Sequence, residues 1–449
     1  MTLRNDLFDI KDGTLVKYYG NAEELVIPNG VTEIGYNACS CSSNLKRVFI
    51  PEGVTKIGLY AFEDCPELEY VSIPDSISDV DESSFMNCPN LKYTEHGGAS
   101  YLGCEKNPYA VLVSLTEKSI TTATPAPGTR VIFEDAYSEI EGLTEAILPE
   151  GVRRIGFNAF GDCTSLKTVK LPSTLTHIDG CAFSGCPSIE EIYIPDGVVE
   201  IGFLAFDCDS LERVRIPDSI EYIGNSAFAN CKKLEYNTFL GCKYLGNELN
   251  PHVVLAGAES ADVAVVGAHY LTKIVLDHAF ENCTTIRRLK LSPKLVHIGE
   301  AAFHGCTSLK IVRLPQNVKN VDRSAFRGCT NLECVDFITG EAIIGPYAFA
   351  CCSSLKMLEL PSRCAKIMEN AFEDCTSIRH LKMHSGFIDS LAFSGCTSLR
   401  AAILEEGVSW LDDNVFNGCT ALRGLVLPRN LEVDLDSLLE NNRLKIFFI

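Results

Sequence analysis

A unit of 23 residues recurs along the chain and constrains its fold more than any other feature of the sequence. The copy from Cys163 to Pro172 reads C-T-S-L-K-T-V-K-L-P, and the copy from Cys306 to Pro315 reads C-T-S-L-K-I-V-R-L-P. The copies continue with the consensus x-x-V-x-x-I-G-x-x-A-F, from which individual copies depart at single positions. Such a period indicates a solenoid, because one unit cannot bury its apolar face alone and needs a neighbour on each side.

The apolar spacing within the unit predicts two short strands in every turn. In L-x-x-V-x-I the last two apolar residues are two apart, so they point to one side of a strand, and the following Pro ends that strand. V-x-x-I-G supplies a second short apolar stretch, in which Gly permits a turn conformation that other residues avoid. We expect parallel strands about 4.8 Å apart, joined by turns and short 3₁₀ pieces, in a stack of about 16 turns.

The Phe of A-F shows the register of the repeat. Most steps between these aromatic residues are 23 residues long, but the steps that end at Tyr137 and Phe280 are both 52. The two extra segments, about 94–128 and 237–271, align at an offset of 143 and share an Asn-Pro turn. We interpret them as homologous hairpin insertions, with inter-domain linkers as the alternative.

Both ends of the chain depart from the unit. Residues 1–34 contain an Asp-Gly turn between two apolar stretches, which predicts a hairpin that caps the first turn. The remainder, 35–449, is expected to be one solenoid. Residues 444–449 repeat the strand pattern once more before the chain stops. An uncovered apolar strand edge is a candidate self-association site.

The cysteines follow the repeat. The chain has 21 of them, and 12 stand three residues after the Phe of the unit. In a small secreted protein this number would suggest a disulfide framework. A column with the period of the repeat indicates buried packing thiols instead, since free Cys behaves as a small apolar residue. Disulfides and metal binding are the alternatives.

Charge and hydropathy narrow the classes of partner. Lys and Arg total 39 against 59 Asp and Glu, which gives a net charge of −20 and disfavours nucleic acid as a partner. No apolar window reaches the length of a membrane span. The first residues contain no apolar run of signal-peptide length, which favours a cytoplasmic protein; a secreted or cell-surface protein is the alternative if a leader has been removed.

No catalytic constellation is visible in the sequence. Phosphate loops, dinucleotide fingerprints and nucleophile elbows are all missing from it. His380 and His384 are four apart, but they fall on strand and Pro positions of the repeat, not on a helix face. We therefore expect a protein without enzymatic activity, cofactor or metal.

The unit resembles the BspA-type leucine-rich repeats, the 23-residue class with the signature C-x-x-L-x-x-I-x-L-P, over nearly the whole chain. The resemblance implies a curved, right-handed leucine-rich repeat solenoid whose L-x-x-V-x-I strands line the concave face. It also implies a bacterial protein that acts by binding, because members are implicated in adhesion to host proteins and in co-aggregation. We expect a scaffold for protein interaction or adhesion, with a host extracellular-matrix or cell-surface protein as the candidate partner. A glycan-binding module and an intracellular scaffold are the alternatives.

Specificity should lie in the positions that the repeat leaves free, just before V and between V and I. In the middle of the chain these positions gather basic residues. With two nearby tyrosines they form a hypothetical partner-binding set: Lys170, Tyr193, Arg213, Arg215, Tyr236, Arg288, Lys290 and Arg313. Arg with aromatic residues is typical of interface anchors and favours an acidic protein segment or an anionic glycan. The alternative is that Lys and Arg only prevent strand pairing on an exposed face.

Overall fold

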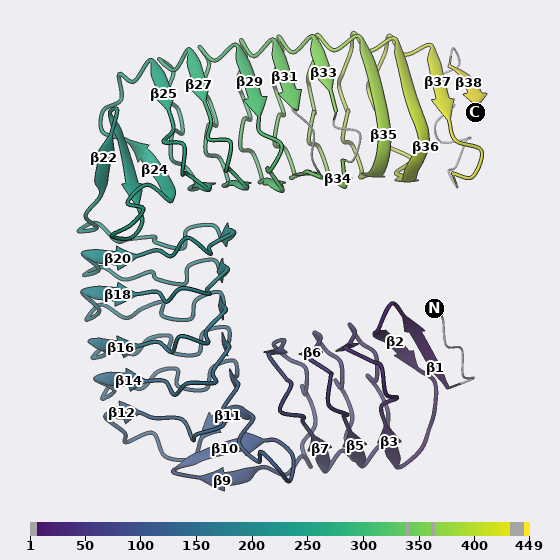
Figure 1. Cartoon of the computed structure of the whole chain (residues 1–449). Helices are drawn as coiled ribbons and strands as arrows, with labels where there is room; N and C mark the ends of the chain where they lie inside the picture. The colour runs from purple at the N-terminus through teal and green to yellow at the C-terminus, as the bar shows by residue number, and fades with distance from the viewer. Residues whose placement is uncertain (1–6, 338–340, 361–363, 432–443) are drawn as a thin grey trace. The chain divides into compact units, whose positions relative to one another are not determined.

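The chain folds into a solenoid of short strands joined by turns (Figure 1). The computed structural model describes residues 7–337, 341–360, 364–431 and 444–449, and within these ranges it contains neither α-helix nor 3₁₀-helix. Single turns take the place of the expected 3₁₀ pieces. The chain divides into two compact units. Unit 1 comprises Met1–Ile220 and Ser226–Glu235, and unit 2 comprises Glu221–Asn225 and Tyr236–Ile449.

Nearly every turn carries the two predicted strands. We call the strand of the L-x-x-V-x-I segment the signature strand, and the strand of the V-x-x-I-G segment the two-residue strand. Strands pair in parallel with counterparts in neighbouring turns, as Glu145 with Thr168 in one ladder and Arg154 with His177 in the other. The solenoid wall therefore consists of two ladders connected by turns, and the signature ladder is interrupted, so that its strands fall into several separate short sheets.

The strands of unit 1 follow this scheme. Its signature strands are β3 (Glu24–Val26), β5 (Arg47–Phe49), β7 (Tyr70–Ser72), β12 (Thr122–Ala123), β14 (Glu145–Ile147), β16 (Thr168–Lys170), β18 (Glu191–Tyr193) and β20 (Arg213–Arg215). Its two-residue strands are β4 (Glu33–Ile34), β6 (Lys56–Ile57), β8 (Asp79–Val80), β13 (Val131–Ile132), β15 (Arg154–Ile155), β17 (His177–Ile178) and β19 (Glu200–Ile201). The amino-terminal hairpin is β1 (Phe8–Lys11) and β2 (Thr14–Tyr18), and the first insertion holds β9 (Thr94–His96), β10 (Ala99–Leu102) and β11 (Val111–Leu115).

Unit 2 repeats the scheme after the short strand β21 (Tyr222–Ile223). The second insertion holds β22 (Asn237–Phe239), β23 (Cys242–Leu245) and β24 (Val254–Ala258). The signature strands are β25 (Val265–Gly267), β27 (Arg288–Lys290), β29 (Ile311–Leu314), β31 (Cys334–Phe337), β33 (Met357–Glu359), β37 (Gly424–Leu427) and β38 (Lys445–Phe448). The two-residue strands are β26 (Ile274–Val275), β28 (His297–Ile298), β30 (Asn320–Val321), β32 (Ile343–Ile344) and β34 (Lys366–Ile367), while β35 (His380–Ile388) and β36 (Ala401–Leu411) extend through both positions.

Each insertion forms a hairpin and then a turn of its own. In the first, β10 pairs antiparallel with β9 and β11, and Val111 of β11 then pairs in parallel with Val131. The next strand, β12, joins the signature ladder beside β14. The second insertion does the same through Val254, which pairs with Ile274. The stack therefore has about 18 turns, not 16, because each insertion adds one turn to those that the Phe column marks.

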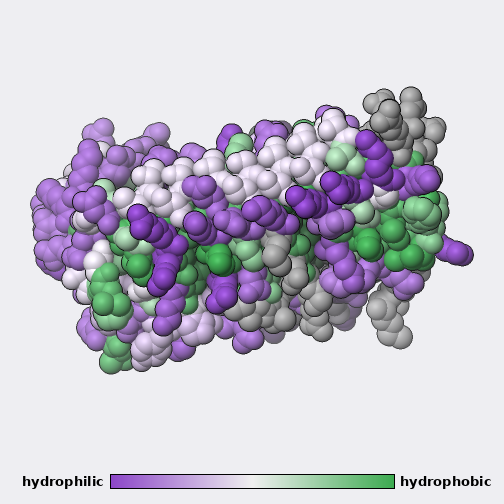
Figure 2. Space-filling view, turned by 90° about the horizontal axis from the view of Figure 1, so that it is seen from above, coloured by the Kyte–Doolittle hydropathy of each residue, from purple (hydrophilic) through white to green (hydrophobic). Residues whose placement is uncertain are grey.

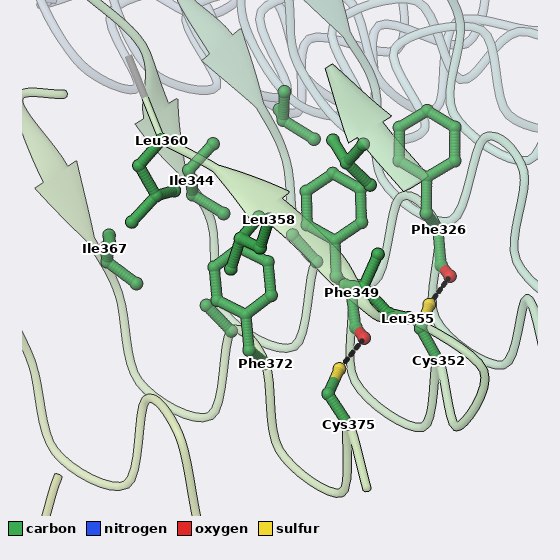
Figure 3. Packing of buried hydrophobic residues seen from close by; sticks show 14 of the residues in the cluster. Phe326, Ile344, Phe349, Cys352, Leu355, Leu358, Leu360, Ile367, Phe372 and Cys375 are labelled. Atoms are coloured by element: carbon green, nitrogen blue, oxygen red, sulfur yellow. Dashed lines mark hydrogen bonds between the residues drawn. The ribbon is translucent and has the colours of Figure 1, made fainter. Parts of the chain in front are cut away.

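The core consists of the aromatic and cysteine columns. Phe326, Phe349 and Phe372 stack with ring centroids 5.1 and 5.3 Å apart and nearly parallel planes. Most column thiols donate a hydrogen bond to the carbonyl of the Phe-column residue in the preceding turn, as Cys375 Sγ does to Phe349 O at 3.2 Å (Figure 3). Burial raises the pKa of the Cys375 thiol. The column is therefore a set of packed thiols, and all 21 cysteines are free.

The Gly of I-G is needed for close packing, which corrects the conformational role predicted for it. Gly58 and Gly156 are not among the residues with positive φ; a residue two positions later, such as Asn158 at φ 53°, takes the left-handed conformation. A Cβ on Gly156 would lie 2.8 Å from Ile132 O of the preceding turn. The turns therefore approach each other too closely here for a side chain.

A bend in unit 1 follows the first insertion. Arg154 on β15 forms ion pairs with Asp79 on β8 and with Asp179, whose Oδ2 lies 2.7 Å from the guanidinium Nε. Arg153 donates to Ser76 O at 3.1 Å across the same bend. These contacts join two-residue strands, so that ladder lies inside the bend. The prediction that the signature strands line the concave face is wrong here, because no helix in the described part of the chain widens the opposite side.

His297 on β28 of unit 2 is the counterpart of Arg154. Its side chain is fully buried, and its ring centroid lies 4.7 Å from that of Tyr222 with the planes at 80°. His297 Nε2 lies 3.3 Å from Asp322 Oδ2. Burial lowers the pKa of His297 to about 4 and raises the pKa of Asp322 to about 7.

The chain ends lie on the sheet edges. β1 pairs antiparallel with β2, which continues in parallel into the two-residue ladder at β4. At the other end β38 pairs in parallel with β37, and Phe447 and Phe448 are exposed. Residues 1–6 of the predicted cap lie outside the described residues. None of the described segments forms a helix long and apolar enough to cross a membrane.

Candidate protein-binding surface

The outward positions of the signature strands point to solvent, as predicted. In β27, Arg288 and Lys290 are exposed while Leu289 between them turns inward. In β16, Thr168 and Lys170 are exposed on either side of Val169. The basic residues of the hypothetical partner-binding set therefore lie on one face of their ladders, and the structure divides them between the two units.

In unit 1 the exposed cations have carboxylate partners from the preceding turn. Lys170 Nζ lies 3.3 Å from Glu145 Oε1, and Arg213 lies 2.9 Å from Glu191 Oε2. The hydrogen bond from Arg213 to Glu191 raises the pKa of the guanidinium. Each cation is locally neutralised, so this part of the surface presents little net positive charge.

Arg215 is folded back onto the solenoid. Its guanidinium lies 4.3 Å from the ring centroid of Tyr193, donates to Ile194 O at 2.9 Å, and pairs with Asp196 at 3.0 Å. Only 13% of its side chain is exposed. Tyr193 and Arg215 thus form an aromatic–guanidinium pair, but the contact is made within the chain and not with a partner.

In unit 2 the basic residues are arranged differently. Arg313 Nε lies 3.7 Å from Asp336 Oδ2, the longest of these contacts. Arg288 and Lys290 have no carboxylate within ion-pair distance among the described residues, because the register places Val265 and Gly267 beside them in the preceding turn. Their charge is therefore available to a ligand.

These cations line a groove, which we call the β27–β29 groove. Its volume is about 960 Å³. Its basic lining residues are Arg287, Arg288, Lys290, Lys310 and Arg313, and its apolar ones are Val265, Leu289, Leu291, Pro293, Ile311 and Pro315. Figure 2 looks onto this face of unit 2, where apolar side chains follow one another between hydrophilic ones. The groove is basic at its rims and apolar at its floor.

The floor of the groove reaches the core. Leu289 and Leu291 are only partly buried, whereas their counterparts Val312 and Leu314 in the next turn are 0% and 1% exposed. Ile311, at an outward position, is 49% exposed. An apolar side chain from a partner could therefore contact core leucines directly.

The second insertion borders this surface at β25. A Cβ on Gly267 would lie 3.7 Å from Leu240 Cδ1, so the exposed Leu240 lies beside that strand. Tyr236 stands at the start of the insertion, where Lys243 Nζ is 5.5 Å from its ring centroid, and it does not line the groove. Sequence reasoning found Arg288, Lys290 and Arg313 but missed Leu240 and the apolar floor.

The histidines give no second site. His384 Nδ1 lies 2.5 Å from Glu405 Oε2, and Glu405 also pairs with Lys382 at 2.9 Å. Hydrogen bonds from Lys382 and His384 lower the pKa of Glu405. Across the described residues, no three His, Cys, Asp or Glu side chains are placed to hold a metal ion.

Two parallel ladders, a Phe stack and a cysteine column, repeated every 23 residues, define a leucine-rich repeat solenoid. The family model for the BspA type leucine-rich repeat region matches residues 3–97, 130–249, 273–396 and 342–449. The chain therefore belongs to the BspA-type leucine-rich repeat family. This fold suggests a protein-binding or scaffolding role. No protein of curated function matches the chain.

Several solved structures are similar to this chain. A leucine-rich repeat protein from Bacteroides ovatus ATCC 8483 is 23% identical, with 97% of this chain and 94% of that chain covered and a TM-score of 0.31. A leucine-rich cell surface protein from Faecalibacterium prausnitzii A2-165 is 21% identical, with 99% and 97% covered and a TM-score of 0.26. The pneumococcal vaccine antigen PcpA is 14% identical, with 100% and 98% covered and a TM-score of 0.31. At these values none of them identifies a partner or a site.

Proposed function

We propose that this chain is a protein-binding solenoid whose docking surface is the signature-strand face of unit 2, centred on the β27–β29 groove. One observation carries this proposal. Arg288 and Lys290, which lack carboxylate partners in the described structure, border a floor on which core leucines are partly exposed. Cationic rims and an apolar centre are the features of a protein interface with an apolar anchor.

The corresponding face of unit 1 serves as the internal reference. It also carries cations at outward positions of its signature strands, but those cations are paired within the chain. If basic residues served only to prevent strand pairing, both faces would do so equally well. The difference in pairing favours a binding role for unit 2.

Adhesion to a host extracellular-matrix or cell-surface protein is the biological setting that we propose for this surface. An intracellular scaffold is the alternative setting, and localisation of the native protein separates the two. A glycan partner would use the same cations but would leave the apolar floor without a function.

The test is site-specific photo-crosslinking in the native cells and on host cells. A photoreactive residue in place of Lys290 should yield one discrete crosslinked protein, whereas the same residue in place of Lys170 should yield none. The double variant Arg288→Glu/Arg313→Glu, combined with the probe at 290, should remove the product. Crosslinks that form equally from both positions, or that persist in the double variant, would show that the groove is not the docking surface. A product that resists protease and stains as carbohydrate would contradict a protein partner.

A further inference from the structure

We infer that the occupant of the β27–β29 groove is an extended acidic segment of the partner, which inserts one large apolar side chain between β27 and β29. This inference rests on the proposed function and adds the chemistry of the ligand. It follows from three observations: where the cations lie, what the floor consists of, and how the two ends of the groove differ.

The charge of the groove calls for an anionic ligand. Arg288 and Lys290 stand two residues apart on one strand, about 7 Å from each other along it. Lys310 and Arg313 belong to the next turn, so cations flank the floor from both strands. The chain as a whole carries a net charge of −20, so this groove is a local exception in an acidic protein. A ligand with carboxylates on both sides of its centre complements it.

The floor of the groove selects a peptide among anionic ligands. Leu289, Leu291 and Ile311 offer partly exposed aliphatic surface between the cations, and Pro293 and Pro315 close its lower side. Nucleic acids and sulfated glycans would satisfy the cations through their backbone charges but would place polar groups over this surface. A peptide offers both parts, because an aliphatic or aromatic residue can alternate with acidic ones along an extended chain.

The dimensions agree with a short segment. A volume of about 960 Å³ lies at the upper end of the range for small-ligand pockets, about 300–1,000 Å³. The floor lies between β27 and β29, which belong to separate sheets and form no strand pair with each other. One large side chain fills the gap over Leu289 and Ile311, and its flanking residues reach the rims. The groove is therefore expected to bind an extended segment of the partner in which an apolar residue is flanked by acidic ones.

The two ends of the groove are chemically different. Toward β25 the surface continues with Val265, which is 53% exposed, and with Leu240 of the second insertion beside Gly267. Toward β31 it meets Asp336, which already pairs with Arg313. A carboxylate of the ligand would be repelled at the β31 end, whereas an apolar residue is favoured at the β25 end. The carboxylates of the segment are therefore expected over the cations of β27 and β29, and an apolar residue beyond them is favoured toward β25.

Fluorescence anisotropy with defined peptides and the full chain tests this inference. The probe is a labelled nine-residue peptide with a central Leu and two Glu on each side of it. Replacing its four Glu with Gln should weaken binding by tenfold or more, and replacing its Leu with Ala by about threefold to thirtyfold. Raising the salt from low to high concentration should weaken the Glu peptide and leave the Gln peptide unchanged.

Matched variants of the chain localise the effect. Arg288→Glu/Lys290→Glu should abolish binding of the acidic peptide, and Ile311→Ser should lower it by about threefold to tenfold. Lys170→Glu/Arg213→Glu in unit 1, and Ile403→Ser on another exposed strand position, should leave it unchanged. Equal binding of the Glu and Gln peptides would overturn the inference, as would an oligodeoxynucleotide of equal charge that binds as tightly.

The outcome for the ligand and the outcome for the function remain separable. If the crosslink from position 290 to a protein persists while neither peptide binds, the docking surface stands and the acidic-segment inference fails. If no crosslink forms from position 290 and the peptides do not bind, the proposed function fails with it. Circular dichroism of each variant shows whether loss of binding reflects loss of folding.

Discussion

Arg154 in unit 1 and His297 in unit 2 occupy the same place in the repeat, 143 residues apart, on the second two-residue strand after an insertion. Arg154 lies among Asp79, Asp81 and Asp179 and forms ion pairs with all three. His297 meets the ring of Tyr222 and a single carboxylate, that of Asp322. Two copies of one sequence element are thus held by an ionic cluster in one unit and by a buried, nearly neutral pair in the other.

The backbone around the two positions is nevertheless alike. Gly156 and Gly299 follow them two residues later, and a Cβ on either would lie within 3.0 Å of the preceding turn. The close approach of the turns is therefore a property of the repeat, whereas the side chains that hold the bend vary. This comparison predicts that side-chain substitutions act differently in the two units and that backbone substitutions act alike.

The largest effect is expected from Arg154→Ala. The substitution leaves the poorly solvated Asp179 carboxylate without its guanidinium partner and leaves Asp79 with Lys56 alone. Loss of one partner of a buried pair costs about 3–5 kcal/mol. Hydrogen exchange measured by mass spectrometry should show faster opening of β8, β13 and β15. Lys170→Ala, which breaks only an exposed pair, is the control and should change these rates little. Equal rates in the two variants would mean that the ionic cluster does not hold the bend.

A smaller and equal effect is expected from Gly156→Ala and Gly299→Ala. Each added methyl group meets backbone atoms of the preceding turn, and overpacking of this kind costs about 1–3 kcal/mol. Urea denaturation and hydrogen exchange should report similar losses in the two units. Gly424→Ala is the matched control, since a Cβ there meets nothing within 4 Å. A loss confined to one unit would contradict the shared backbone geometry.

The effect most specific to unit 2 is a change in pH dependence. The pKa of His297 is lowered from 6.5 to about 4, so its contribution to stability is present above pH 6.5 and is lost as pH falls toward 4. The pKa of Asp322 is raised from 3.8 to about 7, so its contribution is present below pH 3.8 and is lost as pH rises through 7. In the native pair the two contributions oppose each other.

Removing one partner should expose the contribution of the other. In Asp322→Asn, stability should fall as pH decreases from 6.5 to 4, whereas in His297→Phe it should fall as pH increases from 4 to 7. The change should be on the order of 1–3 kcal/mol across each window. Urea titrations followed by the fluorescence of Trp410, the single tryptophan of the chain, measure it in unit 2. Parallel pH profiles in both variants would contradict the opposite contributions of His297 and Asp322.

The repeat predicted the architecture because its markers have fixed structural tasks. The Phe and Cys columns, both strands of each turn and the outward positions of the signature strands were all predictable from the 23-residue register. The number of turns was not, because β11 and β24 enter the two-residue ladder without a Phe that marks their turn. The role of the I-G glycine was also not predictable, since close approach of two turns depends on the stacking distance and not on local sequence.

The candidate site was predictable in part. The register alone places Glu191 beside Arg213 and Tyr193 beside Arg215, and it places Val265 beside Arg288. Comparing each cation with the residue one turn earlier would therefore have separated the paired cations from the available ones. The apolar floor could not be found this way. Leu289 is an apolar residue like those at the equivalent buried positions of other turns, and it differs from them only in its exposure.

The thiol column also allows local unfolding of the solenoid to be measured by alkylation of its cysteines. Each buried Cys reacts with an alkylating reagent only when its hydrogen bond to the preceding turn breaks and the thiol reaches solvent. Because column members such as Cys186, Cys306 and Cys375 recur turn after turn, their separate alkylation rates would map the stability of the solenoid with a resolution of one repeat. Partner binding at the β27–β29 groove should then appear as a local slowing at Cys306 and Cys329, the thiols of the turns around β29, against an unchanged rate at Cys186.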